Sequence, residues 1–171
     1  TVGKVLALLK HPTILLLFFG IFFVVGIDVA TNFVSSKVMM IRFGWDVQEA
    51  GMAPQLYFIS RTVGAFLGMF IMTKMSDILY FRLNVVAAVI SVLVLMFCEV
   101  EWVNLVCIGG IGFFCSCIFP IIYSMAVQHM PDKSNLISGL MVTAVSGGGF
   151  ITPFIGMAID IQGVSGGVAV L

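Results

Sequence analysis

Residues 12–38 read PTILLLFFGIFFVVGIDVATNFVSSKV, a mostly apolar run that is long enough to cross a lipid bilayer as one helix. A bilayer core of about 30 Å needs roughly 20 apolar residues at the rise of an α-helix. Proline stands at the first position, where its missing N–H costs nothing. We therefore predict a membrane-spanning helix over residues 12–38.

The rest of the chain of 171 residues repeats this pattern. Apolar residues make up 61% of it and charged residues 9%, and the mean hydropathy is +1.19, which is outside the usual range of soluble domains. The predicted spans cover residues 12–38, 54–73, 83–97, 103–127 and 136–159. The sequence thus predicts an all-α membrane protein with five transmembrane helices, followed by the start of a sixth.

The polar segments between the spans indicate orientation, because lysine and arginine near span ends are retained in the cytoplasm. One side of the predicted membrane carries Lys4, Lys10, Lys74, Arg82 and Lys133. The other carries Lys37 and also Arg42, which lies in a polar loop predicted over residues 40–50. We expect a multi-pass protein whose amino terminus is cytoplasmic.

Both ends of the chain indicate a fragment. It begins at Thr1 without methionine, and residues 164–171 are too short to span a bilayer. Five spans and the start of a sixth match half of a transporter that is built from three-plus-three helical repeats. We expect residues 1–171 to form one transmembrane half that is truncated at both ends.

Two ionisable side chains lie well inside predicted spans, Asp28 in the first and Arg61 in the second. Counted from the span ends at the helical rise, both lie roughly 15 Å below the outer surface. A charge at that depth costs several kcal/mol unless it is paired or hydrated. Two interpretations stay open: a structural ion pair between adjacent antiparallel helices, or a pair that couples a cation or gates a substrate.

Small and polar side chains lie near these two charges at helical spacing and form a helix face with them. In the first span they are Asn32, Ser35 and Ser36. In the second span they are Ser60, Gly64 and Gly68. The polar face predicts the wall of a wet cavity that includes Asn32, although glycines also occur where helices pack closely.

The fourth span places Phe119, Pro120 and Tyr123 near one another. Aromatic rings at this position could stack on a sugar, and the proline leaves a backbone carbonyl without its usual donor. Packing of the rings in the core is an equal alternative. We treat Phe119 and Tyr123 as candidate substrate contacts.

The fifth span contains GGGFITPF, residues 147–154. Three consecutive glycines lower helix propensity, and Pro153 lacks the N–H that would bond to Gly149. Interrupted helices at membrane depth often mark the sites and gates of transporters, although close packing explains part of this pattern. The candidate hinge residues are Gly147, Gly148, Gly149 and Pro153.

The sequence carries no arrangement that is typical of an enzyme. It has no nucleophile–base pair, metal-ligand cluster or phosphate-binding glycine loop, so we expect no catalytic residues, metal or resident cofactor. The four cysteines lie in or beside apolar runs, where thiols pack as small apolar groups. The sequence has no basic face of the kind that would indicate a nucleic-acid partner.

Four segments, taken in order, resemble the fucose–proton symporter family, a branch of the major facilitator superfamily. The strongest match is GGGFITPFIGMAIDIQG at residues 147–163, which resembles the family's eleventh helix. FFVVGIDVATNF at 22–33, ISRTVGAFLG at 59–68 and FPIIYSMAVQHM at 119–130 are similar to its seventh, eighth and tenth helices. The resemblance implies that the chain is the carboxy-terminal half, with helices 7 to 11 and the start of 12.

Members of that family carry hexoses, deoxyhexoses or amino sugars inward with a proton or sodium ion, by alternating access between two halves. Two positions depart from the fucose carriers. Phe119 stands where they have a tyrosine, and Asp28 stands where they have a neutral polar residue. Both departures leave a different sugar or a different cation site open.

The expected function is therefore sugar–cation symport across the bacterial inner (plasma) membrane. The expected partners are a small sugar, the lipid bilayer and the missing amino-terminal half, with a co-transported proton or sodium ion in place of a cofactor. A sugar-binding receptor or a carrier of another solute on the same fold is the alternative, because fold does not dictate function. A channel fits the interrupted fifth span less well.

Overall fold

The computed structural model describes residues 2–169, apart from the side chains at positions 148, 164 and 165, and every element in this part of the chain is helical. The elements are α1 (Val2–Leu8), α2 (Pro12–Phe43), α3 (Val47–Ala50), α4 (Met52–Met72), α5 (Asp77–Phe97), α6 (Glu101–Cys115), α7 (Ile118–His129), a 3₁₀ turn η1 (Pro131–Lys133), α8 (Ser134–Gly148) and α9 (Ile151–Ala169). Five stretches are long and apolar enough to cross a membrane: Pro12–Phe43, Val47–Met72, Asp77–Phe97, Glu101–His129 and Pro131–Gly163. The predicted all-α fold with five transmembrane helices is confirmed.

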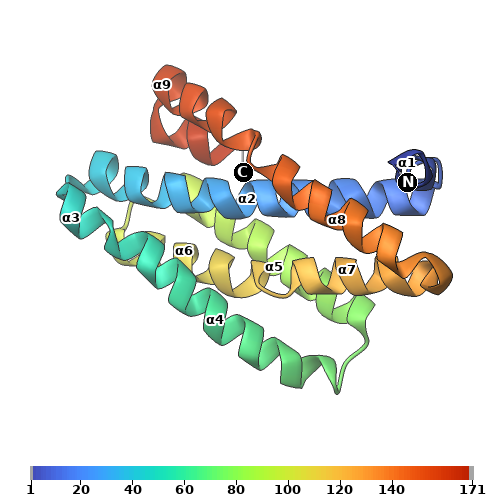
Figure 1. The fold of residues 1–171 in the computed structure, drawn as a ribbon. Helices are drawn as coiled ribbons and strands as arrows, with labels where there is room; N and C mark the ends of the chain where they lie inside the picture. The colour runs from blue at the N-terminus through green and yellow to red at the C-terminus, as the bar shows by residue number, and fades with distance from the viewer. Residues whose placement is uncertain (1, 170–171) are drawn as a thin grey trace.

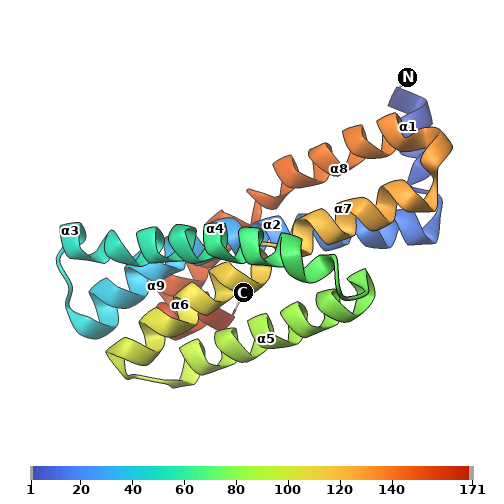
Figure 2. The ribbon, with the colours of Figure 1, turned by 90° about the horizontal axis from the view of Figure 1, so that it is seen from below.

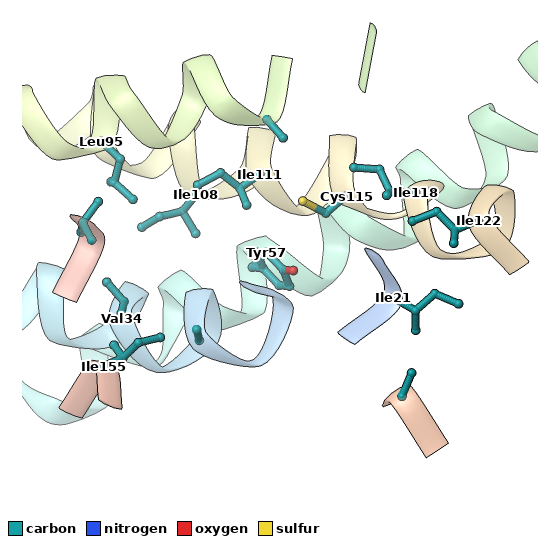
Figure 3. Packing of buried hydrophobic residues seen from close by; sticks show 14 of the residues in the cluster. Ile21, Val34, Tyr57, Leu95, Ile108, Ile111, Cys115, Ile118, Ile122 and Ile155 are labelled. Atoms are coloured by element: carbon teal, nitrogen blue, oxygen red, sulfur yellow. The ribbon is translucent and has the colours of Figure 1, made fainter. Parts of the chain in front are cut away.

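The five stretches form a bundle in which successive stretches run in opposite directions (Figure 1). α2 runs through this bundle and packs against α4, α6, α7, α8 and α9. α6 packs against both α4 and α5, and Figure 2 shows it near them. Ile21, Val34, Ile111 and Ile155 are completely buried in the core along these contacts (Figure 3). Many apolar side chains on the outside are exposed, which suits helices whose solvent is lipid.

Two of the five stretches are interrupted near their middle, and a proline follows each interruption. α6 ends at Cys115 before α7 begins at Ile118, and α8 ends at Gly148 before α9 begins at Ile151. Pro120 and Pro153 cannot donate to the carbonyls four residues earlier, those of Ser116 and Gly149. The missing hydrogen bonds therefore coincide with the gaps between the helices.

Several helices are longer than their predicted spans, because hydropathy does not detect polar helix ends. α5 begins at Asp77 instead of residue 83, and an acidic side chain in a first turn stabilises the positive end of the helix dipole. α2 continues to Phe43 instead of residue 38. Gly44 caps this end, because its φ of 69° lets its backbone N–H donate to the carbonyl oxygen of Met39. The prediction that Arg42 lies in a loop is therefore wrong.

The guanidinium of Arg42 joins the end of α2 to the hairpin between α5 and α6. It donates to the carbonyl oxygens of Leu95, Met96 and Cys98 and to Oδ1 of Asn104, at 2.7 to 3.2 Å. These carbonyls belong to the last turn of α5 and to Cys98, which caps it, where helix carbonyls lack intrahelical donors and the dipole favours a cation. Arg42 thus caps a neighbouring helix.

We expect Arg42→Gln to lower the free energy of unfolding by about 3 kcal/mol, because a charged donor to several carbonyls is lost. Thermal unfolding of the purified protein in detergent measures this change. The control is Lys37→Gln, since the side chain of Lys37 makes no hydrogen bond or ion pair within the described part of the chain. An equal loss in both variants would show that charge, and not capping, matters at this end of α2.

The chain turns at Gly163, whose φ of 72° and ψ of −167° are not helical. Beyond it Gly166 lies close to the carbonyl of Ala158 and Gly167 lies against the side chain of Ile159, so the last part of α9 bends back on the part that precedes Gly163. The predicted start of a sixth helix falls in this segment, and its last residues, 170 and 171, lie outside the described residues. That the segment begins a sixth helix stays a prediction.

Candidate functional site

Asp28 and Arg61 form an ion pair between α2 and α4, through Oδ2 of the carboxylate and one terminal nitrogen of the guanidinium. The Arg61 side chain is 33% exposed and that of Asp28 is 18% exposed. Both residues lie well inside their membrane-length stretches. Asp28 and Arg61 therefore lie next to each other, as the sequence predicted. Whether their role is structural or belongs to transport stays open.

Tyr57, which was not among the predicted site residues, is the third member of this cluster. Its hydroxyl donates to Oδ1 of Asp28, and the residue is completely buried. Tyr57 precedes Arg61 by one helical turn on α4, so both side chains project from the same face. That spacing was the signal available in the sequence. Figure 3 shows Tyr57 in the core beside Ile111 and Cys115 of α6.

Each oxygen of the Asp28 carboxylate accepts from a different donor of α4, Oδ1 from Tyr57 and Oδ2 from Arg61. Hydrogen bonds and ion pairs are stronger in the low dielectric of a bundle than in water. The pair carries no net charge, yet it presents one strong acceptor and one strong donor. Asp28 can therefore release Arg61 and bind a cation instead. Alternatively, Asp28 and Arg61 can release each other and both bind hydroxyl groups of a ligand.

We expect Tyr57→Phe to lower the free energy of unfolding by about 2 kcal/mol, because a hydrogen bond to a charged acceptor is lost while the ring still fills its place. Thermal unfolding measures this change. Tyr123→Phe is the matched control, since Tyr123 bonds to a neutral hydroxyl, for which about 1 kcal/mol is expected. Equal losses in the two variants would argue against a charge-assisted bond at Tyr57.

Asn32 lies one turn beyond Asp28 on α2. Its Nδ2 donates to the backbone oxygen of Asp28 at 3.0 Å, whereas its Oδ1 is buried without a partner in the described part of the chain. The two serines on this side bond to backbone carbonyls, Ser35 to Asn32 and Ser36 to Ala50, and Ser35 is buried. Asn32 therefore holds an unused acceptor, while the serines serve the helix packing.

Phe119 and Tyr123 form a second cluster, in contact with α8. Their ring centroids lie 6.2 Å apart with planes tilted by 30°, and the Tyr123 hydroxyl lies 2.6 Å from the hydroxyl of Ser138. Both rings also pack against the main core. Within the described residues, no hydrogen bond, ion pair or ring contact joins this pair to Asp28 or Arg61. The predicted site residues thus form two groups.

The glycines of the second span lie where α4 closely contacts the end of α6 and the residues that follow it. A Cβ on Gly64 would lie 2.6 Å from the carbonyl oxygen of Phe113, and one on Gly68 would collide with the sulfur of Cys117. In the opposite direction, a Cβ on Gly112 of α6 would lie 2.6 Å from the carbonyl oxygen of Tyr57. Helix packing therefore accounts for these glycines.

The candidate hinge residues lie at the α8–α9 interruption. Gly147 is packed so closely on the Phe22 ring that a Cβ would lie 2.8 Å from it, and Gly149 is in the turn. Gly148 is the last residue of α8, and its surroundings lie outside the described residues. Pro153 is exposed in the first turn of α9. A hinge or gating role stays a prediction.

The bundle also contains a partly open, apolar cavity of about 320 Å³, lined by residues of α2, α5, α6, α7 and α9. Apolar side chains line it, among them Val24, Val85 and Ile111. Asn32, Phe119 and Tyr123 do not line it, and its surface is mostly apolar, which does not suit a sugar. In the part of the chain that the structure describes, no group of three or more histidine, cysteine or acidic side chains could hold a metal ion.

The sequence of the chain is similar to a known protein family and to named relatives. Residues 2–156 match the family model of the Major Facilitator Superfamily. Proteins from two strains of Helicobacter pylori, each named as a candidate glucose/galactose transporter, are 28% identical over 141 residues. That match covers 82% of the chain and 34% of each relative, so the chain spans about a third of their length. Because the family model matches most of the chain, the chain belongs to the Major Facilitator Superfamily.

Proposed function

We propose that the chain is the carboxy-terminal part of a secondary transporter that carries a sugar across the bacterial inner membrane with a proton or sodium ion. Membership in the superfamily indicates a transporter rather than an enzyme. The relatives named for glucose and galactose support a sugar as substrate. The orientation with a cytoplasmic amino terminus and the narrower relation to fucose–proton symporters belong to the same proposal.

The observation that carries the proposal is the cluster of Asp28, Tyr57 and Arg61 inside the bundle. Apolar side chains in place of a buried ion pair are often neutral or stabilising, so stability alone is a weak reason to keep one. Ionisable residues inside membrane spans commonly mark ion or substrate pathways. A pair that alternates between internal partners and ligands fits alternating access between two halves.

The cluster also suits a neutral sugar better than a charged solute. Sugar hydroxyls donate to carboxylates and accept from guanidinium groups, so a pair without net charge satisfies both roles. The unused Oδ1 of Asn32 adds an acceptor beside Asp28. The rings of Phe119 and Tyr123 supply apolar faces on which a sugar ring can stack.

The test is uptake of radiolabelled hexoses, deoxyhexoses and amino sugars by cells that express the full-length protein, with and without a protonophore and with and without sodium. We expect saturable accumulation that one of these treatments abolishes, which identifies the coupling ion. Binding of a sugar without accumulation would favour the receptor alternative. No binding or uptake of any sugar would favour another solute.

We expect Tyr123→Phe to weaken sugar uptake several-fold through a higher KM, with membrane expression unchanged, because the variant removes a hydroxyl beside the proposed stacking surface. Ser138→Ala is the matched control, since it removes the partner of that hydroxyl and leaves the phenol in place. If both variants take up sugar normally, Tyr123 belongs to the packing between α7 and α8.

A further inference from the structure

α1 lies at one end of the bundle and turns away from the long axis of α2 (Figures 1 and 2). A turn joins the two helices, with the N–H groups of Leu9, Lys10 and His11 bonded to carbonyls three residues earlier. α1 packs against α8, and Leu8 is buried with 2% of its surface exposed. The helix therefore lies across the end of the bundle and is held there by its own apolar contact.

The remaining surface of α1 has an apolar side and a basic side. Val2 and Leu6 lie one turn apart and are 73% and 56% exposed. Lys4 lies two residues from each of them, which places it on the opposite side of the helix. Exposed apolar residues on one side and a lysine on the other suit a segment that lies in the membrane interface.

Further cations gather at this end of the molecule. Lys10 and His11 are exposed in the turn after α1, and His129 and Lys133 are exposed where α7 and α8 are joined, with Asp132 beside them. The opposite end of the bundle carries the acidic residues Asp46, Glu49, Glu99 and Glu101, together with the basic Lys37 and Arg42 near the end of α2. The charges of the chain are thus separated along the bundle.

We propose that α1 and the α7–α8 connection form a docking surface for anionic phospholipid headgroups. The ammonium groups of Lys4, Lys10 and Lys133 donate to the headgroup phosphates, while Val2 and Leu6 enter the boundary of the acyl chains. Charge complementarity selects this occupant, because a zwitterionic surface offers the apolar boundary without the net attraction. The proposal does not depend on the substrate or on the coupling ion.

The test places the purified full-length protein in nanodiscs of phosphatidylcholine that contain a small fraction of phosphatidylglycerol. Native mass spectrometry then counts the lipids of each class that stay bound. A lysine near an anionic surface changes affinity by a factor of about five. We expect preferential retention of phosphatidylglycerol by the parent protein and at least a fivefold loss of that preference in the Lys4→Gln, Lys10→Gln double variant.

Two further variants make the outcome specific. Lys37→Gln removes a cation from the opposite end, and its preference for phosphatidylglycerol should stay that of the parent. Leu6→Ser keeps the charge and should lower retention of both lipids, because the apolar contact is lost. The proposal is overturned if the parent protein shows no preference, if the double variant keeps it, or if Lys37→Gln loses it equally.

Discussion

Replacing Arg61 with alanine is expected to abolish transport and to lower the free energy of unfolding by about 3 to 5 kcal/mol, the largest effect of any substitution considered for this protein. The variant leaves the Asp28 carboxylate inside the bundle with Tyr57 as its remaining described donor. A carboxylate that loses its cationic partner in low dielectric becomes strongly unfavourable. Thermal unfolding in detergent and sugar uptake by cells measure the two effects.

A double-mutant cycle separates the ion pair from the side chains that form it. Asp28→Asn and Arg61→Gln each leave one unpaired charge, whereas the double variant leaves two neutral amides that can bond to each other. We therefore expect the double variant to be more stable than either single variant, with a coupling energy of about 1 to 3 kcal/mol. Losses that simply add would show that the two charges do not depend on each other.

Transport in the double variant answers a different question from stability. A purely structural ion pair predicts that restored folding also restores uptake. A pair that exchanges partners with a cation or sugar predicts a stable protein without coupled uptake, because neither neutral amide can take over the charge. The uptake of the stable double variant therefore decides between the two roles that the sequence leaves open.

Gly112→Ala is expected to lower the free energy of unfolding by about 3 kcal/mol, although it adds only one methyl group. The new Cβ would lie 2.6 Å from the carbonyl oxygen of Tyr57 and 3.0 Å from a carbon of its ring. Backbone atoms are on one side of this contact, so α4 and α6 must move apart. That displacement also moves the Tyr57 hydroxyl away from Asp28, and uptake should fall with stability.

Gly139→Ala is the matched control, because nothing lies within 4 Å of the Cβ it would add on α8. Alanine is favoured over glycine inside a helix, so this variant should be stabilised by about 0.5 to 1 kcal/mol. The two Gly→Ala changes thus have opposite expected signs in one melting experiment. A Gly112→Ala protein as stable as Gly139→Ala would mean that α4 and α6 are not in close contact.

The sequence by itself determined the class, the number of spans and the positions of Asp28 and Arg61 inside two of them. These features follow from hydropathy, length and chain geometry, which are local. It also placed the interruption of the fifth span, because Pro153 removes a hydrogen bond at a fixed position, whereas at Pro120 it indicated only a freed carbonyl and not the gap between α6 and α7. The resemblance to a transporter family, drawn from four short segments, agrees with the superfamily match.

Only the tertiary structure decided which side chains meet. Tyr57 bonds to Asp28, and Arg42 caps α5 instead of lying in a loop. The aromatic pair Phe119 and Tyr123 forms a group apart from the ion pair. It also assigned the glycines of α4 to helix packing. In a soluble protein, the apolar stripe of each helix indicates the face that is buried. In lipid most of the surface of each helix is apolar, so hydropathy says little about the rotation and register of the helices, which depend on contacts between distant segments.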